Sequence, residues 1–324
     1  MQEALMHIFL APMEGITDSI YRRLHASMFS GVEKYYIPFV SPSQNLCFSP
    51  REKYLLDPKE NQDIPTVPQL LAKDASLFLW AAGEIREMGY GEVNLNLGCP
   101  ASTVTAKGKG SAMLKDIEAL SRFLDDIFEK SPLPVSLKTR IGYDSLALWP
   151  DLSALFARYP FSEVIIHPRL REEFYQGMPH QEAFIQSLSL FSCPVIYNGD
   201  IFRKEEGESL LARRPDIHGL MLGRGILCNP ALARELQGGE KLKKEELKAF
   251  HDALFLAYRE KYDAHIALMR MKALMTYMGC CFEQGDKIKK AMKKATNEKT
   301  YLPAAEQLFA SCALKADPHF YWEK

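Results

Sequence analysis

The stretch Gly91-Glu92-Val93-Asn94-Leu95-Asn96-Leu97-Gly98-Cys99-Pro100 carries the most informative local pattern in this sequence of 324 residues. Its apolar part predicts a short buried strand from Gly91 to Leu97. Gly98-Cys99-Pro100 then predicts a turn that leaves a thiol at the C-terminal end of that strand. Barrel enzymes keep their chemistry at this end of their strands. Cys99 is therefore a candidate proton donor or nucleophile.

Seven other runs are similar short segments rich in Val, Ile, Leu and Phe, and most begin after Gly or Pro. Stretches with helical periodicity, such as 75–88 and 117–128, lie between many of them. This alternation predicts parallel strands joined by right-handed crossovers. Eight repeats over roughly 230 residues favour a closed (β/α)8 TIM barrel, which typically takes about 250. The eight runs are His7 to Met13, Tyr35 to Val40, Thr66 to Leu71, Gly91 to Leu97, Pro134 to Arg140, Glu163 to Arg169, Pro194 to Asp200 and Gly219 to Arg224.

An open, doubly wound sheet is the alternative α/β fold. It is less favoured because no glycine-rich dinucleotide fingerprint follows the first strand. After Gly238-Gly239 the strand pattern stops, and helical spacing is found over 241–262, 266–278, 287–296 and 303–314. We therefore expect a catalytic barrel over residues 1–238 and a small helical domain over residues 239–324.

The overall composition is that of an ordinary globular protein, with 47% hydrophobic and 25% charged residues. No apolar run approaches the roughly 20 residues needed to span a bilayer. The segment from Met1 to His7 lacks a secretory signal pattern. The 7 scattered cysteines favour reduced thiols in a cytoplasmic protein, without Cys/His spacing for zinc. No feature of the sequence points to a protein partner.

The charge is distributed unevenly along the chain. Residues 241–324 contain 16 Lys and Arg against 11 Asp and Glu, whereas residues 1–240 contain 24 against 30. A basic C-terminal part favours contact with a polyanion. The alternative is a solvated helix face.

Polar residues stand at the C-terminal ends of the predicted strands, where purely structural strands would be apolar. They include Gln69, Asn96, Lys138, His167 and Asn198. Taken singly, each of them could instead serve a turn, a cap or the protein surface. Together they suit a flavin mononucleotide: Gln69 could meet the ring edge and Lys138 the anionic reduced ring. The backbone of Asn198-Gly199-Asp200 and of Gly223-Arg224-Gly225 could hold the phosphate.

These motifs resemble the signatures of the tRNA-dihydrouridine synthases, in the family's order and spacing, from about residue 8 to residue 228. The tail is more loosely similar, at His265 and Arg270-Met271-Lys272. The motifs that carry the resemblance are Ala11-Pro12-Met13-Glu14-Gly15-Ile16-Thr17-Asp18, Asn94 to Pro100, Lys138-Thr139-Arg140-Ile141-Gly142, His167-Pro168-Arg169, Asn198-Gly199-Asp200 and Leu222-Gly223-Arg224-Gly225.

The resemblance implies a flavin-binding barrel and a helical RNA-binding domain. It implies FMN that is reduced by NADPH and then reduces the C5=C6 bond of a uridine in folded tRNA. Asn96 would help to seat the uracil and Cys99 would be the acid. The residues implied at the cofactor are Pro12, Met13, Gln69, Lys138 and His167 at the ring or ribityl chain, and Asn198, Gly199, Asp200, Gly223 and Arg224 at the phosphate.

The proposed role of Cys99 agrees with the chemistry. Hydride addition at C6 leaves enolate-like charge over C5, C4 and O4, and a proton must then reach C5 from the face opposite the flavin. A thiol above the ring can deliver that proton. The alternative is a buried structural cysteine, which is a common state for Cys.

A uracil in folded RNA must leave its stack, which costs a few kcal/mol. Basic side chains can supply compensating phosphate contacts. Lys107-Gly108-Lys109-Gly110 after Cys99 is either a mobile loop over the substrate or simply a glycine-rich turn. Candidate RNA contacts are Lys107, Lys109, Arg169 and Arg171 on the barrel, and Arg270, Lys272, Lys287, Lys289, Lys290, Lys293 and Lys294 in the tail.

Two departures and three alternatives remain open. His167 is followed by Pro168-Arg169-Leu170 where the family commonly has Gly-Arg-Thr, so an N–H and a hydroxyl are lost. The region from Tyr35 to Pro42 lacks an acidic residue that relatives often carry. The alternatives are an FMN barrel dehydrogenase acting on a free pyrimidine, a synthase acting on another structured RNA such as rRNA, and an RNA-binding protein with a vestigial barrel.

Overall fold

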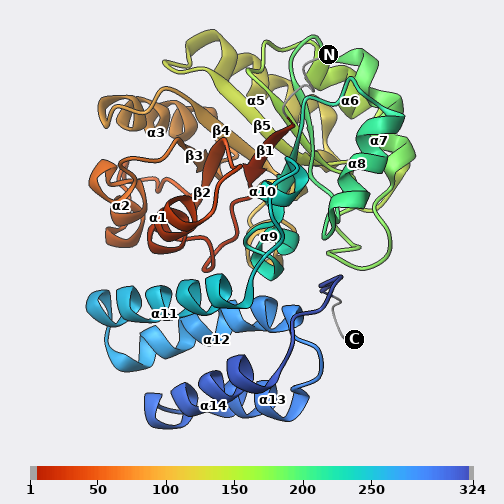
Figure 1. Cartoon of the computed structure of the whole chain (residues 1–324). Helices are drawn as coiled ribbons and strands as arrows, with labels where there is room; N and C mark the ends of the chain where they lie inside the picture. The colour runs from red at the N-terminus through yellow and green to blue at the C-terminus, as the bar shows by residue number, and fades with distance from the viewer. Residues whose placement is uncertain (1–5, 321–324) are drawn as a thin grey trace.

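The computed structural model describes residues 6–320, so residues 1–5 of the N-terminal segment and residues 321–324 of the tail lie outside the description. Eight parallel strands close into a barrel in the order β1 to β8 (Figure 1). β1 pairs with β8 in the register His7↔Gly219, which closes the barrel, confirms the predicted (β/α)8 fold and excludes the open sheet. The strands are β1 His7–Leu10, β2 Lys34–Val40, β3 Thr66–Leu70, β4 Val93–Leu97, β5 Val135–Arg140, β6 Val164–His167, β7 Val195–Tyr197 and β8 Gly219–Leu222.

Several strands end earlier than their apolar patterns predict. β1 stops at Leu10 and β6 at His167, in each case shortly before a proline. Proline has no N–H to offer to the neighbouring strand, so the ladder ends there. The polar residues that follow therefore lie in loops at the C-terminal mouth of the barrel rather than on the strands.

Helices surround the barrel and bury one apolar face against it. In α5 the buried residues Leu120, Phe123, Leu124 and Ile127 recur at helical spacing, and Asp116 caps the helix by accepting from the N–H of Ala119. The elements are α1 Ser19–Met28, α2 Pro50–Leu56, η1 Pro58–Glu60, α3 Ala75–Glu87, α4 Ser102–Thr105, η2 Gly110–Lys115, α5 Ile117–Lys130, η3 Leu146–Leu148, α6 Trp149–Ala157, α7 Gln181–Ser187, η4 Leu188–Leu190, α8 Lys204–Arg213, α9 Arg224–Cys228 and α10 Leu232–Leu236.

The C-terminal helices form a separate layer beside the barrel (Figure 1). They are α11 Lys244–Lys261, α12 Ala264–Met278, η5 Gly279–Cys281, α13 Asp286–Lys294 and α14 Glu298–Ser311. The predicted start of the last helix at Pro303 was wrong. α14 begins at Glu298 because the Asn297 side chain accepts from the N–H of Thr300 and caps the helix, which leaves Pro303 inside it.

Two general properties bear on the expectations from composition. Every cysteine is a free thiol in the described part of the chain. Among residues 6–320, no helix combines the length and the apolar character needed to cross a bilayer.

Candidate active site

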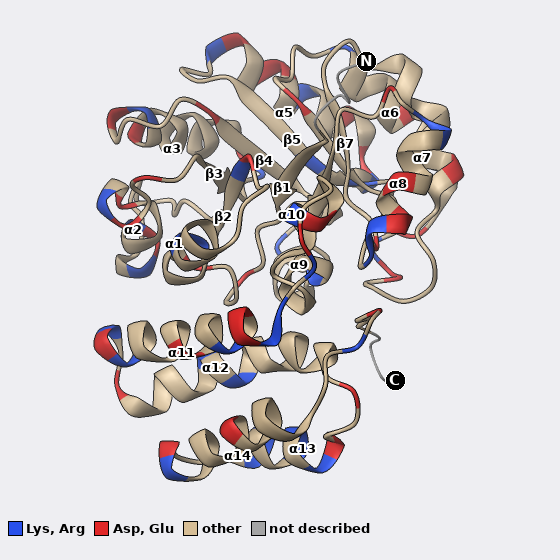
Figure 2. Ribbon diagram, viewed as in Figure 1, with Lys and Arg blue, Asp and Glu red and all other residues tan. Residues whose placement is uncertain are grey.

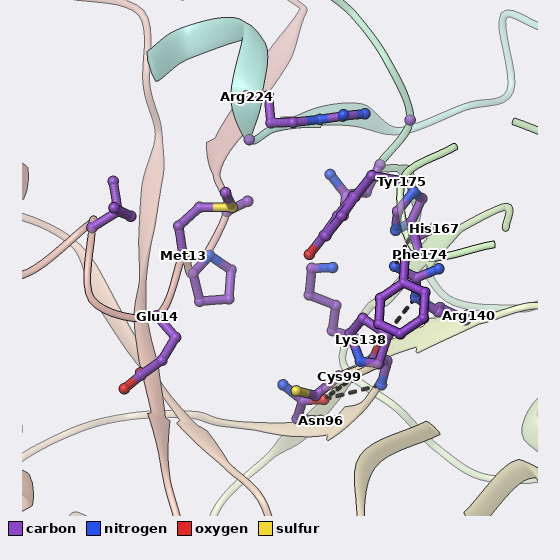
Figure 3. Close-up of a pocket in the computed structure, with 18 of the residues that line it drawn as sticks. Met13, Glu14, Asn96, Cys99, Lys138, Arg140, His167, Phe174, Tyr175 and Arg224 are labelled. Atoms are coloured by element: carbon purple, nitrogen blue, oxygen red, sulfur yellow. Dashed lines mark hydrogen bonds between the residues drawn. The ribbon is translucent and has the colours of Figure 1, made fainter. Parts of the chain in front are cut away.

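A cavity of about 400 Å³ opens at the C-terminal mouth of the barrel. The C-terminal ends of β2 to β6 and the loops that follow β1, β4, β6, β7 and β8 line it. Figure 3 shows Cys99 and Arg224 at opposite ends of the view with Lys138 between them. The structure therefore brings together residues as far apart in the sequence as Pro12 and Arg224. The predicted site residues in its lining are Pro12, Met13, Gln69, Asn96, Cys99, Lys138, His167, Asn198, Gly199, Asp200, Gly223 and Arg224.

A chain of polar side chains runs through the buried strand ends to the Cys99 turn. It passes from Ser136 through Asn94 and Gln69 to Asn96, with links of 2.9, 2.8 and 2.7 Å. Asn96 Oδ1 then accepts from the backbone N–H groups of Gly98 at 3.0 Å and Cys99 at 2.9 Å. Each amide link joins one NH₂ to one carbonyl oxygen, so the whole chain has one consistent orientation. Asn96 thus holds the backbone of the cysteine that it precedes.

The carbonyl groups around Cys99 are held as well. Arg140 Nε donates to the carbonyl of Gly98 at 3.0 Å, and Ser111 Oγ donates to that of Cys99 at 2.8 Å. The backbone at Gly110 packs closely against this turn: a Cβ added at Gly110 would lie 3.0 Å from the Cys99 carbonyl oxygen. Gly110 has φ +60°, so both space and backbone favour glycine there. The turn is consequently fixed on both sides of the thiol.

The environment keeps the Cys99 thiol protonated. Burial raises its pKa, and this effect exceeds the opposing influence of the Ala101 N–H and of the Arg140 and Lys138 charges. A thiol is then the dominant form at neutral pH. A protonated thiol suits a proton donor better than a nucleophile, which must be a thiolate.

Lys138 lines the cavity from β5 and is partly buried, and its ammonium has no hydrogen bond or ion pair with any residue of the described chain. Burial, followed by repulsion from Arg140, lowers its pKa to about 7. A buried cation without a counter-charge gains most from an anionic ligand. Lys138 is therefore suited to contact a bound group that becomes negatively charged when it is reduced.

His167 is a neutral imidazole in this site. Arg169 Nη1 lies 3.1 Å from His167 Nε2, and because a guanidinium only donates, Nε2 must accept and Nδ1 must carry the proton. Burial and the surrounding cations hold its pKa well below the usual range. The residue is thus a hydrogen-bond donor in the cavity wall.

Asp200 joins two arginines at the end of the cavity opposite Cys99. It forms ion pairs with Arg169 and with Arg224, whose guanidinium lies 5.0 Å from the Tyr175 ring. Arg169 is fully buried and also donates to the carbonyls of Gln176 and Gly177. This burial does not support the direct RNA contact expected for Arg169, whereas Arg224 lines the cavity.

The predicted RNA contacts outside the cavity separate into paired and unpaired groups. Arg270 pairs with Asp18, Lys272 Nζ donates to the carbonyl of Ala295, and Lys289 pairs with Asp286. These side chains are committed to contacts within the protein. Among the predicted contacts, the exposed lysines are Lys107 beside the Cys99 turn and Lys287, Lys290, Lys293 and Lys294 on α13. Figure 2 marks Lys and Arg segments of α13 in blue.

The lining residues without a role assigned from the sequence include Glu14, Arg140, Phe174, Tyr175 and Tyr277. Phe174 and Tyr175 could have been noted as an aromatic pair after His167, and Arg140 and Glu14 stand inside quoted motifs. Tyr277 comes from α12 of the helical layer, and its ring packs 4.8 Å from that of Phe320. No local pattern points from Tyr277 to a barrel cavity.

A closed parallel barrel with a polar cavity at the C-terminal ends of its strands is the architecture of the (β/α)8 enzymes. Solved structures with this fold include morphinone reductase, with a TM-score of 0.52, 13% identity and coverage of 74% of this chain and 87% of that one. A variant of NCR from Zymomonas mobilis gives a TM-score of 0.51 with 14% identity, over 74% and 88% of the two chains. At these identities the likeness concerns the fold alone.

The family model for dihydrouridine synthase (Dus) matches residues 9–315. A probable tRNA-dihydrouridine synthase of Staphylococcus epidermidis is 31% identical over 270 residues, which cover 78% of each chain. One of Rhodobacter capsulatus is 30% identical over 69% of this chain and 68% of its own, and the tRNA-dihydrouridine(16) synthase of Pseudomonas syringae is 28% identical over 73% and 76%. The chain belongs to the dihydrouridine synthase family, which confirms the resemblance seen in its motifs, and it is an oxidoreductase.

Proposed function

We propose that this protein reduces the C5=C6 bond of specific uridines in tRNA to 5,6-dihydrouridine, with FMN as its flavin, NADPH as the reductant and Cys99 as the proton donor to C5. Family membership supports the reaction, and the names of its relatives support tRNA as the substrate. The observation that carries the proposal is that a protonated thiol and an unpaired ammonium line one cavity.

The residues present fit FMN. The cavity volume of about 400 Å³ is in the range of small-molecule sites. Lys138 offers a cation for a reduced ring, while Arg224 and the side-chain-free backbone of Gly199 and Gly223 offer a phosphate site. When bound, FMN supplies a hydride to C6 of the uracil.

Cys99 completes the reduction. Once C6 has received the hydride, the electron pair of the former double bond is delocalised over C5, C4 and O4. The Cys99 thiol gives its proton to C5, and solvent restores the proton to the sulfur. Asn96 and Arg140 hold the peptide groups next to the thiol, so the donor does not have to be ordered during each turnover.

The RNA would be held outside the cavity by phosphate contacts. The exposed lysines of α13 and Lys107 at the Cys99 loop are the groups that this proposal assigns to the phosphates, which makes residues 239–324 the principal RNA-binding domain. A tRNA substrate supports the cytoplasmic location that we propose for the enzyme.

The test is a comparison of Cys99→Ala with Cys193→Ala, a thiol that does not line the cavity. We expect Cys99→Ala to keep FMN and NADPH oxidation but to form dihydrouridine about 100-fold or more slowly. Wild-type turnover in Cys99→Ala would refute the assignment. Transcriptome-wide mapping of dihydrouridine with and without the protein identifies the uridine and tests rRNA, and assays with free uracil test the free-pyrimidine alternative.

A further inference from the structure

Aromatic and cationic side chains alternate in a series of contacts that begins at Phe174, a residue of the cavity lining. The Arg171 guanidinium lies 4.9 Å from the Phe174 ring centre and 5.2 Å from that of Tyr143. Lys115 Nζ lies 3.7 Å from the Tyr143 ring centre. These four residues, Phe174, Arg171, Tyr143 and Lys115, are called the rim ladder below. Its inner end, Phe174, lines the cavity (Figure 3).

Arg171 fixes the rim ladder to the loop that carries the thiol. Its Nε donates to the carbonyl of Pro100 at 3.1 Å, and its Nη2 lies 3.3 Å from both Ser102 Oγ and Thr105 Oγ1. A guanidinium held at three points is a rigid plane. A ring that packs on it is consequently held in one position relative to Cys99.

Phe174 has an unusual conformation for its residue type. Its φ is +51°, in the left-handed region that bulky residues rarely adopt, and Arg140 Nη2 donates to its carbonyl at 2.6 Å. Its side chain is nevertheless 38% exposed. The backbone is thus held in a costly state that presents an apolar ring to solvent instead of burying it.

We propose that Phe174 stacks on the base next to the reduced uridine in the RNA, the nucleotide that stays outside when the uridine enters the cavity. This inference rests on the proposed function. Stacking on an aromatic face accepts any base, and a guanidinium behind the ring stiffens the platform. A uridine turned out of its helix leaves its neighbour unstacked, so the rim ladder offers that neighbour a new partner at the point where the strand enters the cavity.

The first test compares substitutions at Phe174. Loss of one stacked base corresponds to about 5- to 150-fold in affinity. We expect F174A and F174L to raise the KM for tRNA by that factor while F174Y stays close to wild type, because stacking needs an aromatic ring and not merely an apolar one. FMN content and NADPH oxidation without RNA are measured for all three, so that a change in the cavity itself is separated from a change in RNA binding. Met178→Ala is the matched control, since Met178 is 80% exposed on the same loop but is not part of the rim ladder.

The second test identifies the stacked base. Two tRNA transcripts carry an abasic site on the 5′ or the 3′ side of the mapped uridine, and KM is measured for wild type and F174A. We expect the two enzymes to become equal on one of the transcripts. A wild-type KM for F174A, full rescue by F174L, or an undiminished difference on both transcripts overturns the inference. If the wild-type enzyme forms no dihydrouridine in tRNA, the proposed function fails instead, so the two failures are distinguishable.

Discussion

Asp18 in the loop after β1 and Arg270 of α12 form an ion pair of 2.6 Å between Oδ2 and Nη1, across the boundary between the barrel and the helical layer. Asp18 also caps α1 by accepting from the N–H of Tyr21 and accepts from the hydroxyl of Tyr258 in α11 at 3.0 Å. One carboxylate thus joins three helices, and a residue of the first sequence motif has an architectural role.

Arg270→Ala is expected to destabilise the protein. The carboxylate of Asp18 is buried and would lose its closest cation, which in comparable pairs lowers the free energy of unfolding by about 3 kcal/mol or more. Chemical denaturation measures this effect, with Lys290→Ala on exposed α13 as a control that should change little. If Arg270→Ala weakens tRNA binding without any loss of stability, Arg270 is an RNA contact as the sequence suggested.

Lys138 should make the stability of the flavin-free protein depend on pH. Its pKa is lowered to about 7 by burial, whereas a lysine in an unfolded chain titrates near 10.4. Between these values the unfolded chain binds a proton that the folded chain does not, so the unfolding free energy rises with pH, by up to about 1.4 kcal/mol per unit. The difference between wild type and Lys138→Met should therefore grow in favour of wild type from about pH 7 to pH 9. Parallel pH curves for the two proteins would contradict this assignment.

Asn96→Ala should slow the proton transfer more than it affects the flavin. The substitution leaves the N–H groups of Gly98 and Cys99 without their acceptor, and a displaced thiol can reduce the rate by up to about 100-fold. Rapid mixing should show normal flavin reduction by NADPH and slow dihydrouridine formation. Ser136→Ala, at the far end of the same amide chain, provides the comparison and should have a much smaller effect. Equal effects of the two substitutions would argue against a specific link to Cys99.

Arg224→Met should distinguish FMN from riboflavin. A phosphate that loses a charged hydrogen-bond partner should bind about 10- to 100-fold more weakly, while riboflavin, which lacks the phosphate, keeps its affinity. Asp200 retains its pair with Arg169 in this variant, so its charge is still compensated. Fluorescence titration of the flavin-free protein gives both constants, and Arg203→Met, an exposed arginine paired with Glu206, serves as control. A parallel loss for both flavins would indicate a collapsed cavity instead of a phosphate contact.

The sequence predicted the strands and the mouth residues well because both signals are local. The run before Cys99 has the length and composition of a buried strand, and a glycine or proline follows within two residues of most strand ends. Lys138, His167 and Arg224 lie in the cavity because the C-terminal ends of parallel barrel strands meet at one face.

The parts that sequence reasoning missed depend on contacts between distant segments. Nothing near Arg270 indicates that its partner is Asp18, and nothing near Arg169 indicates that Asp200 draws it behind the cavity wall. The start of α14 is a different case, since Asn297 carries a local cap signal that the reading from Pro303 overlooked. The type of each element can be predicted from local sequence, whereas the direction of a side chain and its distant partner cannot.

The Tyr277 side chain gives the helical layer a share in the barrel cavity. Exchanging residues 239–324 between family members would therefore exchange part of the cavity wall together with the surface that we propose binds the RNA. In such chimaeras, the uridine that is reduced and the rate of its reduction should change together. Evolution toward a new uridine position in tRNA would therefore also change the wall of the catalytic cavity.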